Sequence, residues 1–162
     1  MKNMDYVLDV KNLSTSFISD RKEVRIVKNV SLRLRRGTTL AVVGESGCGK
    51  SVTVHSIVKL MPKNAKVTAD QVLYRSAKDG KEYRLDQMEP YGSEMRKLRG
   101  AEIGMVFQDP MSSLNPVYKV GDQVAEGLIQ HTGMSKAEAR EKVLDMFRKL
   151  GIPDPESRIN DY

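Results

Sequence analysis

The clearest chemical signal in the sequence is the run GESGCGKS, from Gly44 to Ser51. It follows the pattern G-x-x-x-x-G-K-S, in which glycines let the backbone approach phosphate oxygens closely. Successive N–H groups at the start of a helix form an anion site there, and the helix dipole adds a favourable potential. The run therefore predicts a loop that binds the phosphates of a nucleotide.

Two side chains of this loop carry the functional groups. Lys50 would reach the β- and γ-phosphates as a point charge, and the hydroxyl of Ser51 would ligate Mg²⁺. The alternative is a glycine turn that joins a strand to a helix and binds nothing. The predicted nucleotide-binding residues are Gly44, Glu45, Ser46, Gly47, Cys48, Gly49, Lys50, Ser51 and Val52.

Cys48, the only cysteine in the chain, lies inside this loop. A helix N-terminus and the neighbouring Lys50 both favour its thiolate, while the simpler interpretation is a small residue that fits the loop. We expect alkylation of Cys48 to block nucleotide binding. A single cysteine also excludes an intrachain disulfide and fits a reducing compartment.

The flanks of the loop predict the elements that position it. Before it, TTLAVVG (residues 38–44) is apolar without alternation, as expected of a strand covered on both faces. After it, residues 50–62 place apolar side chains at helical spacing, and Pro62 should end that helix.

Other patterns indicate more strands in the first two thirds of the chain. A short helix is expected over residues 93–100, with Ser93 as its N-cap and Gly100 at its end. Residues 109–116, DPMSSLNP, have the composition of a loop. Strand-like patterns occupy residues 6–17, 24–37, 71–76, 81–85 and 102–108.

The last third of the chain is helical in pattern. Residues 120–133 would bury Val120, Val124 and Leu128 along one face. The final stretch, GIPDPESRINDY, resembles a polar connector without a closing helix. The fold class is therefore α/β at the start, followed by a helical addition.

A second helix of this region has a clear beginning and end. Ser135 and Glu138 form a capping box at its start, and Gly151 provides its stop. Its inner face should consist of Ala139, Val143, Phe147 and Leu150.

The composition of the chain limits which binding partners we expect. The 162 residues carry a net charge of +6, which could suit a nucleotide, a nucleic acid or an anionic membrane surface. The basic residues are scattered, aromatic residues make up 6%, and no nucleic-acid fingerprint is present, so we predict a solvated basic surface and no nucleic-acid partner. Neither a signal peptide nor an apolar run long enough to span a bilayer is found.

A second cluster of residues, RGAEIGMVFQDPMSSLNPV, contains Gln108. It narrows the choice among the families of proteins that share the phosphate-loop pattern. Together with VGESGCGKSV it resembles the nucleotide-binding subunit of ATP-binding cassette (ABC) transporters. The runs FQDPMSSLNP, GDQVAEGL, KAEAREKVLDMF and LGIPDPESRINDY resemble the oligopeptide/dipeptide and nickel importer branch. The resemblance implies a P-loop NTPase core, with ATP and Mg²⁺ as cofactors.

The resemblance also implies roles at matching positions. Gln108 corresponds to the glutamine that contacts Mg²⁺ and the attacking water, which makes it a catalytic and metal-contacting candidate. Phe17 falls where the family stacks an aromatic ring on adenine, although a core role for Phe17, or stacking by Tyr6, is the alternative. Residues 1–108 correspond to the N-terminal part of the ATPase core, and residues 109–162 to the helical subdomain.

Full-length members of this branch couple ATP hydrolysis to import of a solute. The implied partners are transmembrane permease subunits, a second ATP-binding subunit and, indirectly, a solute-binding protein. The implied location is cytoplasmic and peripheral, on the inner face of the cell membrane. The cargo stays open between oligopeptide, dipeptide, nickel and another small solute.

Several family motifs are missing from this sequence. It contains no LSGGQ-like signature, no apolar strand ending in Asp-Glu and no later switch histidine, and it stops a few residues before the expected signature. We therefore expect ATP binding at most and no hydrolysis by this chain alone. A non-catalytic short form that binds nucleotide or permease is the alternative, and a P-loop kinase of another family is a weaker one.

Overall fold

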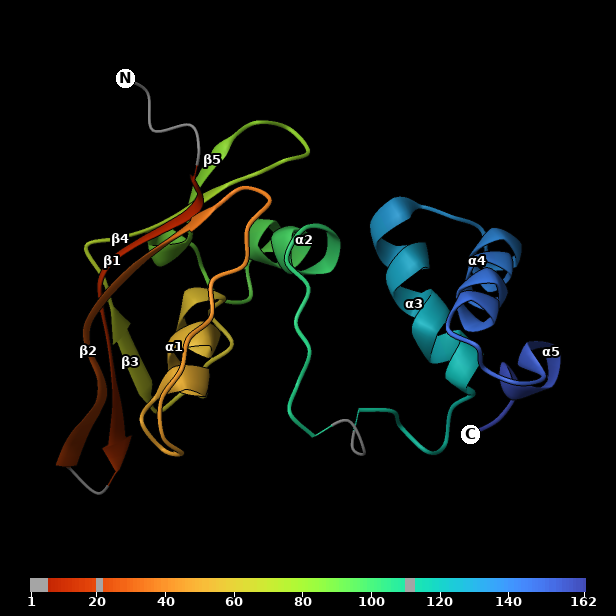
Figure 1. The fold of residues 1–162 in the computed structure, drawn as a ribbon, viewed down its shortest axis with the longest axis horizontal. Helices are drawn as coiled ribbons and strands as arrows, with labels where there is room; N and C mark the ends of the chain where they lie inside the picture. Colours follow the sequence, from red (N-terminus) through yellow and green to blue (C-terminus); the bar gives the residue numbers. More distant parts are fainter. Residues whose placement is uncertain (1–5, 20–21, 110–112) are drawn as a thin grey trace. The chain divides into compact units, whose positions relative to one another are not determined.

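The computed structural model describes residues 6–19, 22–109 and 113–162. The chain divides into two compact units, Met1–Glu102 and Ile103–Tyr162, which are coloured from red to green and from green to blue in Figure 1. Part of the loop predicted at residues 109–116 lies outside the described residues. Among the described helices, none has the length and apolar composition needed to cross a bilayer.

The first unit is built on one antiparallel sheet. Its strands are β1 (Tyr6–Ser19), β2 (Lys22–Arg35), β3 (Ala65–Thr68), β4 (Gln71–Arg75) and β5 (Glu82–Arg84). The strand order is β2-β1-β4-β5, and β3 also pairs with β1. Strand β1 is therefore the centre of the sheet, which explains why Val10 and Leu13 are almost fully buried. The predicted strands at residues 6–17, 24–37, 71–76 and 81–85 are confirmed.

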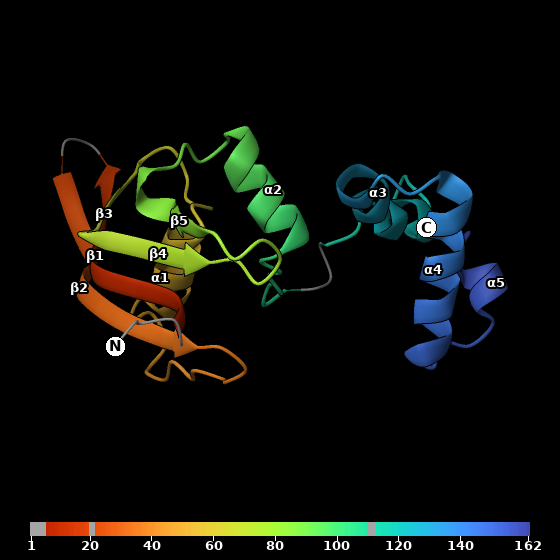
Figure 2. The ribbon, with the colours of Figure 1, turned by 90° about the horizontal axis from the view of Figure 1, so that it is seen from above.

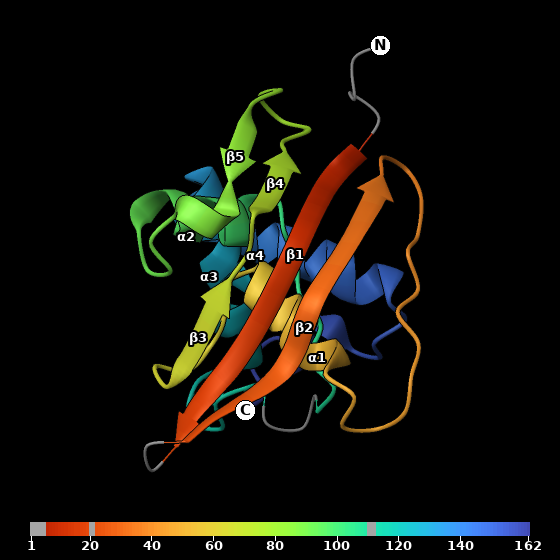
Figure 3. The same cartoon turned by 90° about the vertical axis from the view of Figure 1, so that its left-hand side faces the viewer.

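Three helical segments complete this unit. They are α1 (Lys50–Ile57), the 3₁₀ turn η1 (Leu85–Gln87) and α2 (Ser93–Ala101). Helix α1 lies behind β1 and β2 in the view of Figure 3, so it covers one face of the sheet. Leu85, Met95 and Leu98 are buried and fill the core beside it.

Two details of these helices differ from the prediction. Gly92, not Ser93, is the N-cap of α2, and no side chain caps that end. Helix α1 ends at Ile57 rather than near Pro62. Lys59 adopts a left-handed conformation (φ 56°), and the N–H of Leu60 donates to the carbonyl of His55 at 2.9 Å. This Schellman-type closure ends the helix before the proline is reached.

The segments at 38–44 and 102–108 are not strands, contrary to the prediction. Their apolar side chains are largely in contact with solvent, with Val43 87% and Val106 97% exposed. A strand requires a neighbour that accepts and donates its backbone hydrogen bonds. No described strand pairs with either segment, so the strand-forming sequence alone does not produce one.

The second unit is a small helical bundle. It consists of α3 (Val120–Thr132), α4 (Lys136–Lys149) and α5 (Pro155–Arg158), and the last two lie side by side in Figures 1 and 2. The capping box of α4 is confirmed, since the Glu138 N–H donates to Ser135 Oγ at 3.3 Å and the Ser135 N–H donates to Glu138 Oε2 at 2.9 Å. Gly151 takes a positive φ of 70° at the predicted stop.

The core of this unit differs in part from the predicted faces. Val124 is 41% and Leu150 68% exposed, so neither belongs to it. Helix α3 instead buries small residues, Gly121 and Ala125, against the other helices and the end of the chain. The buried core residues are Ala125, Ala139, Val143, Leu144, Phe147 and Ile159.

The final segment is packed and not a loose connector, which corrects the expectation for GIPDPESRINDY. Ile159 is 1% exposed. The carbonyl oxygens of Ile159 and Asp161 accept the N–H groups of Gly121 (2.9 Å) and Val120 (2.8 Å). These bonds satisfy donors that have no partner inside the first turn of α3. The close approach depends on Gly121, where a Cβ would lie 2.2 Å from Ile159 Cγ1 and 2.6 Å from its carbonyl oxygen.

We predict that Gly121→Ala destabilises the second unit by about 1–3 kcal/mol, because the added methyl group overpacks this contact. The matched control is Gly127→Ala on the same helix, where a Cβ meets nothing within 4 Å. That control should stabilise the chain by roughly 0.5–1 kcal/mol through helix propensity. Urea unfolding followed by circular dichroism measures both effects. Equal shifts in the same direction would contradict the packing argument.

Candidate functional site

The predicted phosphate loop connects an extended segment to α1. Gly47 and Gly49 have φ values of 80° and 97°, which only glycine adopts without strain. Gly49 is also the N-cap of α1, and its missing side chain lets the helix approach β2. A Cβ at Gly49 would lie 3.4 Å from the carbonyl oxygen of Ile26 and 3.5 Å from Val27 Cγ2.

The first glycine of the loop has a different role. A Cβ on Gly44 would lie 2.8 Å from the Sγ atom of Cys48, closer than real contacts allow. The loop therefore turns back on itself, and the N–H of Cys48 donates weakly to the carbonyl of Glu45 at 3.4 Å. This turn keeps the backbone N–H groups of the loop near the start of α1.

The N-terminus of α1 is suited to an anion. No side chain caps it, and no acidic residue stands in its first turn. The N–H groups of a first turn lack intrahelical acceptors and add to the positive end of the helix dipole. An oxyanion bound beside the N–H groups of Gly49 and Lys50 would supply the missing acceptors.

The side chain of Lys50 forms hydrogen bonds within the loop. Its Nζ atom donates to the carbonyl oxygens of Gly44 (2.7 Å) and Glu45 (2.6 Å) and lies 3.6 Å from Cys48 Sγ. The two carbonyl oxygens are neutral acceptors, and among the described residues no carboxylate forms an ion pair with Lys50. A phosphate would replace neutral acceptors with charged ones, which make stronger hydrogen bonds.

The remaining loop residues are accessible from solvent. Ser46 and Ser51 are exposed, and Val52 is half-buried. Ser51 is the second residue of α1, and its hydroxyl is a hard oxygen ligand of the kind that Mg²⁺ prefers. Within the described residues, no group of three or more His, Cys, Asp or Glu side chains could hold a metal by itself.

Sequence reasoning missed the residues that hold α1 in place. A buried hydrogen bond of 2.8 Å joins Thr15 Oγ1 on β1 to Ser56 Oγ on α1. At the end of the helix, Arg99 Nη1 donates to the carbonyls of Val58 (3.4 Å) and Lys59 (3.3 Å). These partners are about 40 residues apart in sequence, and no local pattern marks them.

Phe17 lies on β1, half-buried, opposite Val24 on β2 and Ala65 on β3. Its place in base stacking stays a prediction. The alternative aromatic residue, Tyr6, already contacts two guanidinium groups, with Arg33 at 5.3 Å and Arg35 at 5.6 Å from the ring centre. A hydrogen bond from Arg35 is the main cause that lowers the pKa of Tyr6. This engagement favours Phe17 over Tyr6 as the stacking residue.

Gln108 belongs to the second unit, while the loop from Gly44 to Ser51 belongs to the first. It is exposed and lies in a segment that is neither helix nor strand. Its predicted contact with Mg²⁺ and water therefore stays a prediction.

The comparisons with known proteins agree with the motifs. Residues 27–162 match the family described as ABC transporter. The dipeptide transport ATP-binding protein DppD of Bacillus subtilis (strain 168) is 47% identical over 160 residues, covering 98% of this chain and 45% of that protein. The oligopeptide transport ATP-binding protein OppD of the same strain is 42% identical over 157 residues, covering 96% of this chain and 42% of that protein.

The fold is similar to that of solved ATP-binding cassettes. One is a dimeric post-hydrolysis state bound to ADP and Pi, with a TM-score of 0.72 and 22% identity over 95% of this chain and 60% of that chain. The predicted fold class, the N-terminal portion of an α/β P-loop core, is thereby confirmed. The chain spans a little under half the length of these two curated relatives.

We predict that bound ATP protects Cys48 from N-ethylmaleimide, because this exposed thiol lies beside Lys50 in the loop. At an ATP concentration about ten times Kd, the rate of modification should fall about tenfold, in proportion to the free fraction. Mass spectrometry of the time course measures the rate. AMP, which lacks the β- and γ-phosphates, is the control and should protect little. Equal rates with and without ATP would show that the thiol lies outside the site.

Proposed function

The chain belongs to the ABC transporter family, and from this premise we propose that it binds ATP through the loop Gly44–Ser51 as part of a peptide-import ATPase. The observation that carries the proposal is the loop itself. It combines an uncapped helix N-terminus with a lysine whose ammonium group donates to two neutral carbonyl oxygens. Both features are stabilised by a polyphosphate.

Binding would rearrange few groups. The ammonium of Lys50 would exchange the carbonyls of Gly44 and Glu45 for β- and γ-phosphate oxygens, and the N–H groups around Gly49 would donate to the same phosphates. The Ser51 hydroxyl would hold Mg²⁺, which neutralises phosphate charge when bound. Phe17 would supply an apolar face for the adenine ring.

Hydrolysis needs groups beyond these. We assign Gln108 to orient the attacking water, but the sequence contains no signature loop, no Asp-Glu strand end and no switch histidine. Phosphoryl transfer depends on positioning and on charge stabilisation, so half of the required set is missing. The proposed activity of this chain alone is therefore binding, and hydrolysis belongs to a longer protein.

The assembly is proposed from the relatives. Two of them are named as dipeptide and oligopeptide transport ATP-binding proteins, and the solved neighbour is dimeric. We propose a second ATP-binding subunit and permease subunits as partners, with a solute-binding protein delivering a peptide. The resulting location is the inner face of the cell membrane. Residues 109–162 would form part of the helical subdomain of such a cassette.

We predict that Lys50→Met raises the Kd for ATP by roughly 10- to 100-fold, because it removes a charge-assisted hydrogen bond to phosphate. Lys97→Met, on the exposed surface of α2, is the matched control and should leave the Kd unchanged. Equilibrium dialysis with labelled ATP measures both. If both variants bind ATP as the original chain does, the loop is not the site.

We also expect no ATP turnover by this chain, because the carboxylates that position Mg²⁺ and water are missing from the sequence. Release of inorganic phosphate should equal that of the Lys50→Met variant. A rate above that control would contradict the assignment of hydrolysis to a longer protein.

A further inference from the structure

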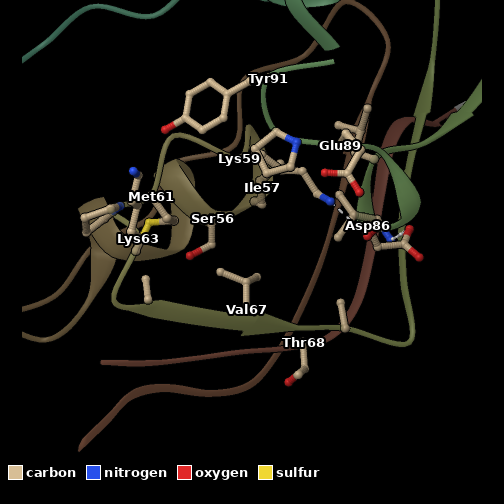
Figure 4. Close-up of a pocket in the computed structure, with 16 residues that line it drawn as sticks. Ser56, Ile57, Lys59, Met61, Lys63, Val67, Thr68, Asp86, Glu89 and Tyr91 are labelled. Carbon is tan, nitrogen blue, oxygen red and sulfur yellow. Dashed lines mark hydrogen bonds between the residues drawn. The ribbon is translucent and has the colours of Figure 1, made fainter. Parts of the chain in front are cut away.

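A second candidate binding site lies in the first unit, at the opposite end of α1 from the phosphate loop. It is a cavity of about 630 Å³, lined by residues between Ser56 and Tyr91. The last turn of α1, strand β3 and the segment around Asp86 and Glu89 enclose it, as Figure 4 shows. Its volume falls within the roughly 300–1,000 Å³ that is typical of small-molecule sites.

Part of the cavity lining is apolar. Ile57, Val72 and Leu85 line it and are each less than 10% exposed. In Figure 4, Val67 projects from β3 toward Ser56 and Ile57 of α1. An apolar group of a ligand would find contacts on several sides here, which favours burial of a hydrocarbon body.

Lys59 brings to this cavity a positive charge that has no direct ion pair among the described residues. Its ammonium donates to the backbone carbonyls of Asp86 (3.0 Å) and Met88. An ammonium has three N–H groups, so these bonds leave one for another acceptor. Among the described residues, no carboxylate lies within ion-pair distance of Lys59. Burial lowers its pKa, and the more distant Asp86 and Glu89 act in the opposite direction.

The carboxylate of Asp86 is occupied by other donors. It accepts the N–H of Val72 at 2.8 Å and both Nε (2.9 Å) and Nη2 (2.7 Å) of Arg84. It therefore forms a direct ion pair with Arg84 and acts on Lys59 only at longer range. The lining thus holds two cations, Lys59 and Lys63, and two anions, Asp86 and Glu89. A negative charge beside Lys59 would compensate the cost of holding its ammonium away from water.

We propose that this cavity binds a small monocarboxylic acid with an apolar body. The carboxylate accepts the remaining N–H of Lys59, and the apolar body packs on Ile57, Val67 and Leu85. This site is separate from the proposed ATP site and does not depend on it, because the two lie at opposite ends of α1.

The test uses 4-phenylbutyrate and its neutral amide, 4-phenylbutyramide, in equilibrium dialysis against the 162-residue chain. The two probes share the apolar body and differ in charge. We expect the carboxylate to bind at least about tenfold more tightly than the amide. Equal affinity of the two probes, or no binding of either, overturns the proposal.

Three lysine variants locate the binding. Lys59→Met should lower the affinity for 4-phenylbutyrate about tenfold and leave the affinity for the amide unchanged. Lys66→Met, an exposed lysine on β3 that does not line the cavity, is the matched control and should bind as the original chain does. Lys50→Met should also retain binding, and ATP should not compete. Loss of binding in Lys50→Met would assign the acid to the phosphate loop and overturn the proposal.

A fourth variant tests the site independently, in case the Lys59→Met protein does not fold. Val67→Phe places a larger apolar ring beside Ser56 and Ile57 and keeps every charge, so it should weaken binding of both probes while circular dichroism stays unchanged. A folded Val67→Phe protein that still binds 4-phenylbutyrate with the original affinity would place the acid elsewhere and contradict the proposal.

Discussion

The position of α1 against the central strand is the contact on which the rest of the first unit depends. Thr15 and Ser56, which are 0% and 2% exposed, join the two elements by a buried hydrogen bond. Ser56 also donates to the carbonyl of Val52, so loss of the contact would leave the buried Thr15 hydroxyl unpaired at a cost of roughly 1–3 kcal/mol, and the bond fixes the helix in one place. Gly49 permits the same closeness at the other end of the helix, beside Ile26. A short helix of eight residues thereby gains a defined direction.

That direction gives the two ends of α1 different chemistry. The N-terminus has donors without acceptors and presents them to the phosphate loop, where Lys50 donates to neutral carbonyls. The C-terminus has acceptors without donors, and Arg99 supplies these donors. Lys59 follows in a left-handed conformation that turns the chain toward the cavity. Both candidate sites therefore lie at the ends of one helix, and only the phosphate loop gains from the positive end of its dipole.

The structure also shows where local sequence preference is insufficient. Residues 38–44 and 102–108 have strand-forming composition and still lack strand geometry, because no described strand pairs with them. The capping box of α4 forms as the sequence predicts, because Ser135 and Glu138 are neighbours along the chain. The distance in sequence between partners separates the two cases: a cap is satisfied within a few residues, whereas a buried strand needs partners from elsewhere. The curated relatives are more than twice as long as this chain, which spans 45% and 42% of two of them.

The sequence by itself determined the phosphate loop, its helix, most strands of the antiparallel sheet and the ATPase family, because these depend on short patterns and on local backbone geometry. Only the tertiary structure decided that Ile159 closes the core of the second unit, that Thr15 holds α1, and that Lys59 has no carboxylate partner among the described residues. The packing of Ile159, the bond of Thr15 and the surroundings of Lys59 all involve segments far apart in the chain. No periodicity or motif encodes such a pairing, since it depends on which surfaces meet when the elements pack.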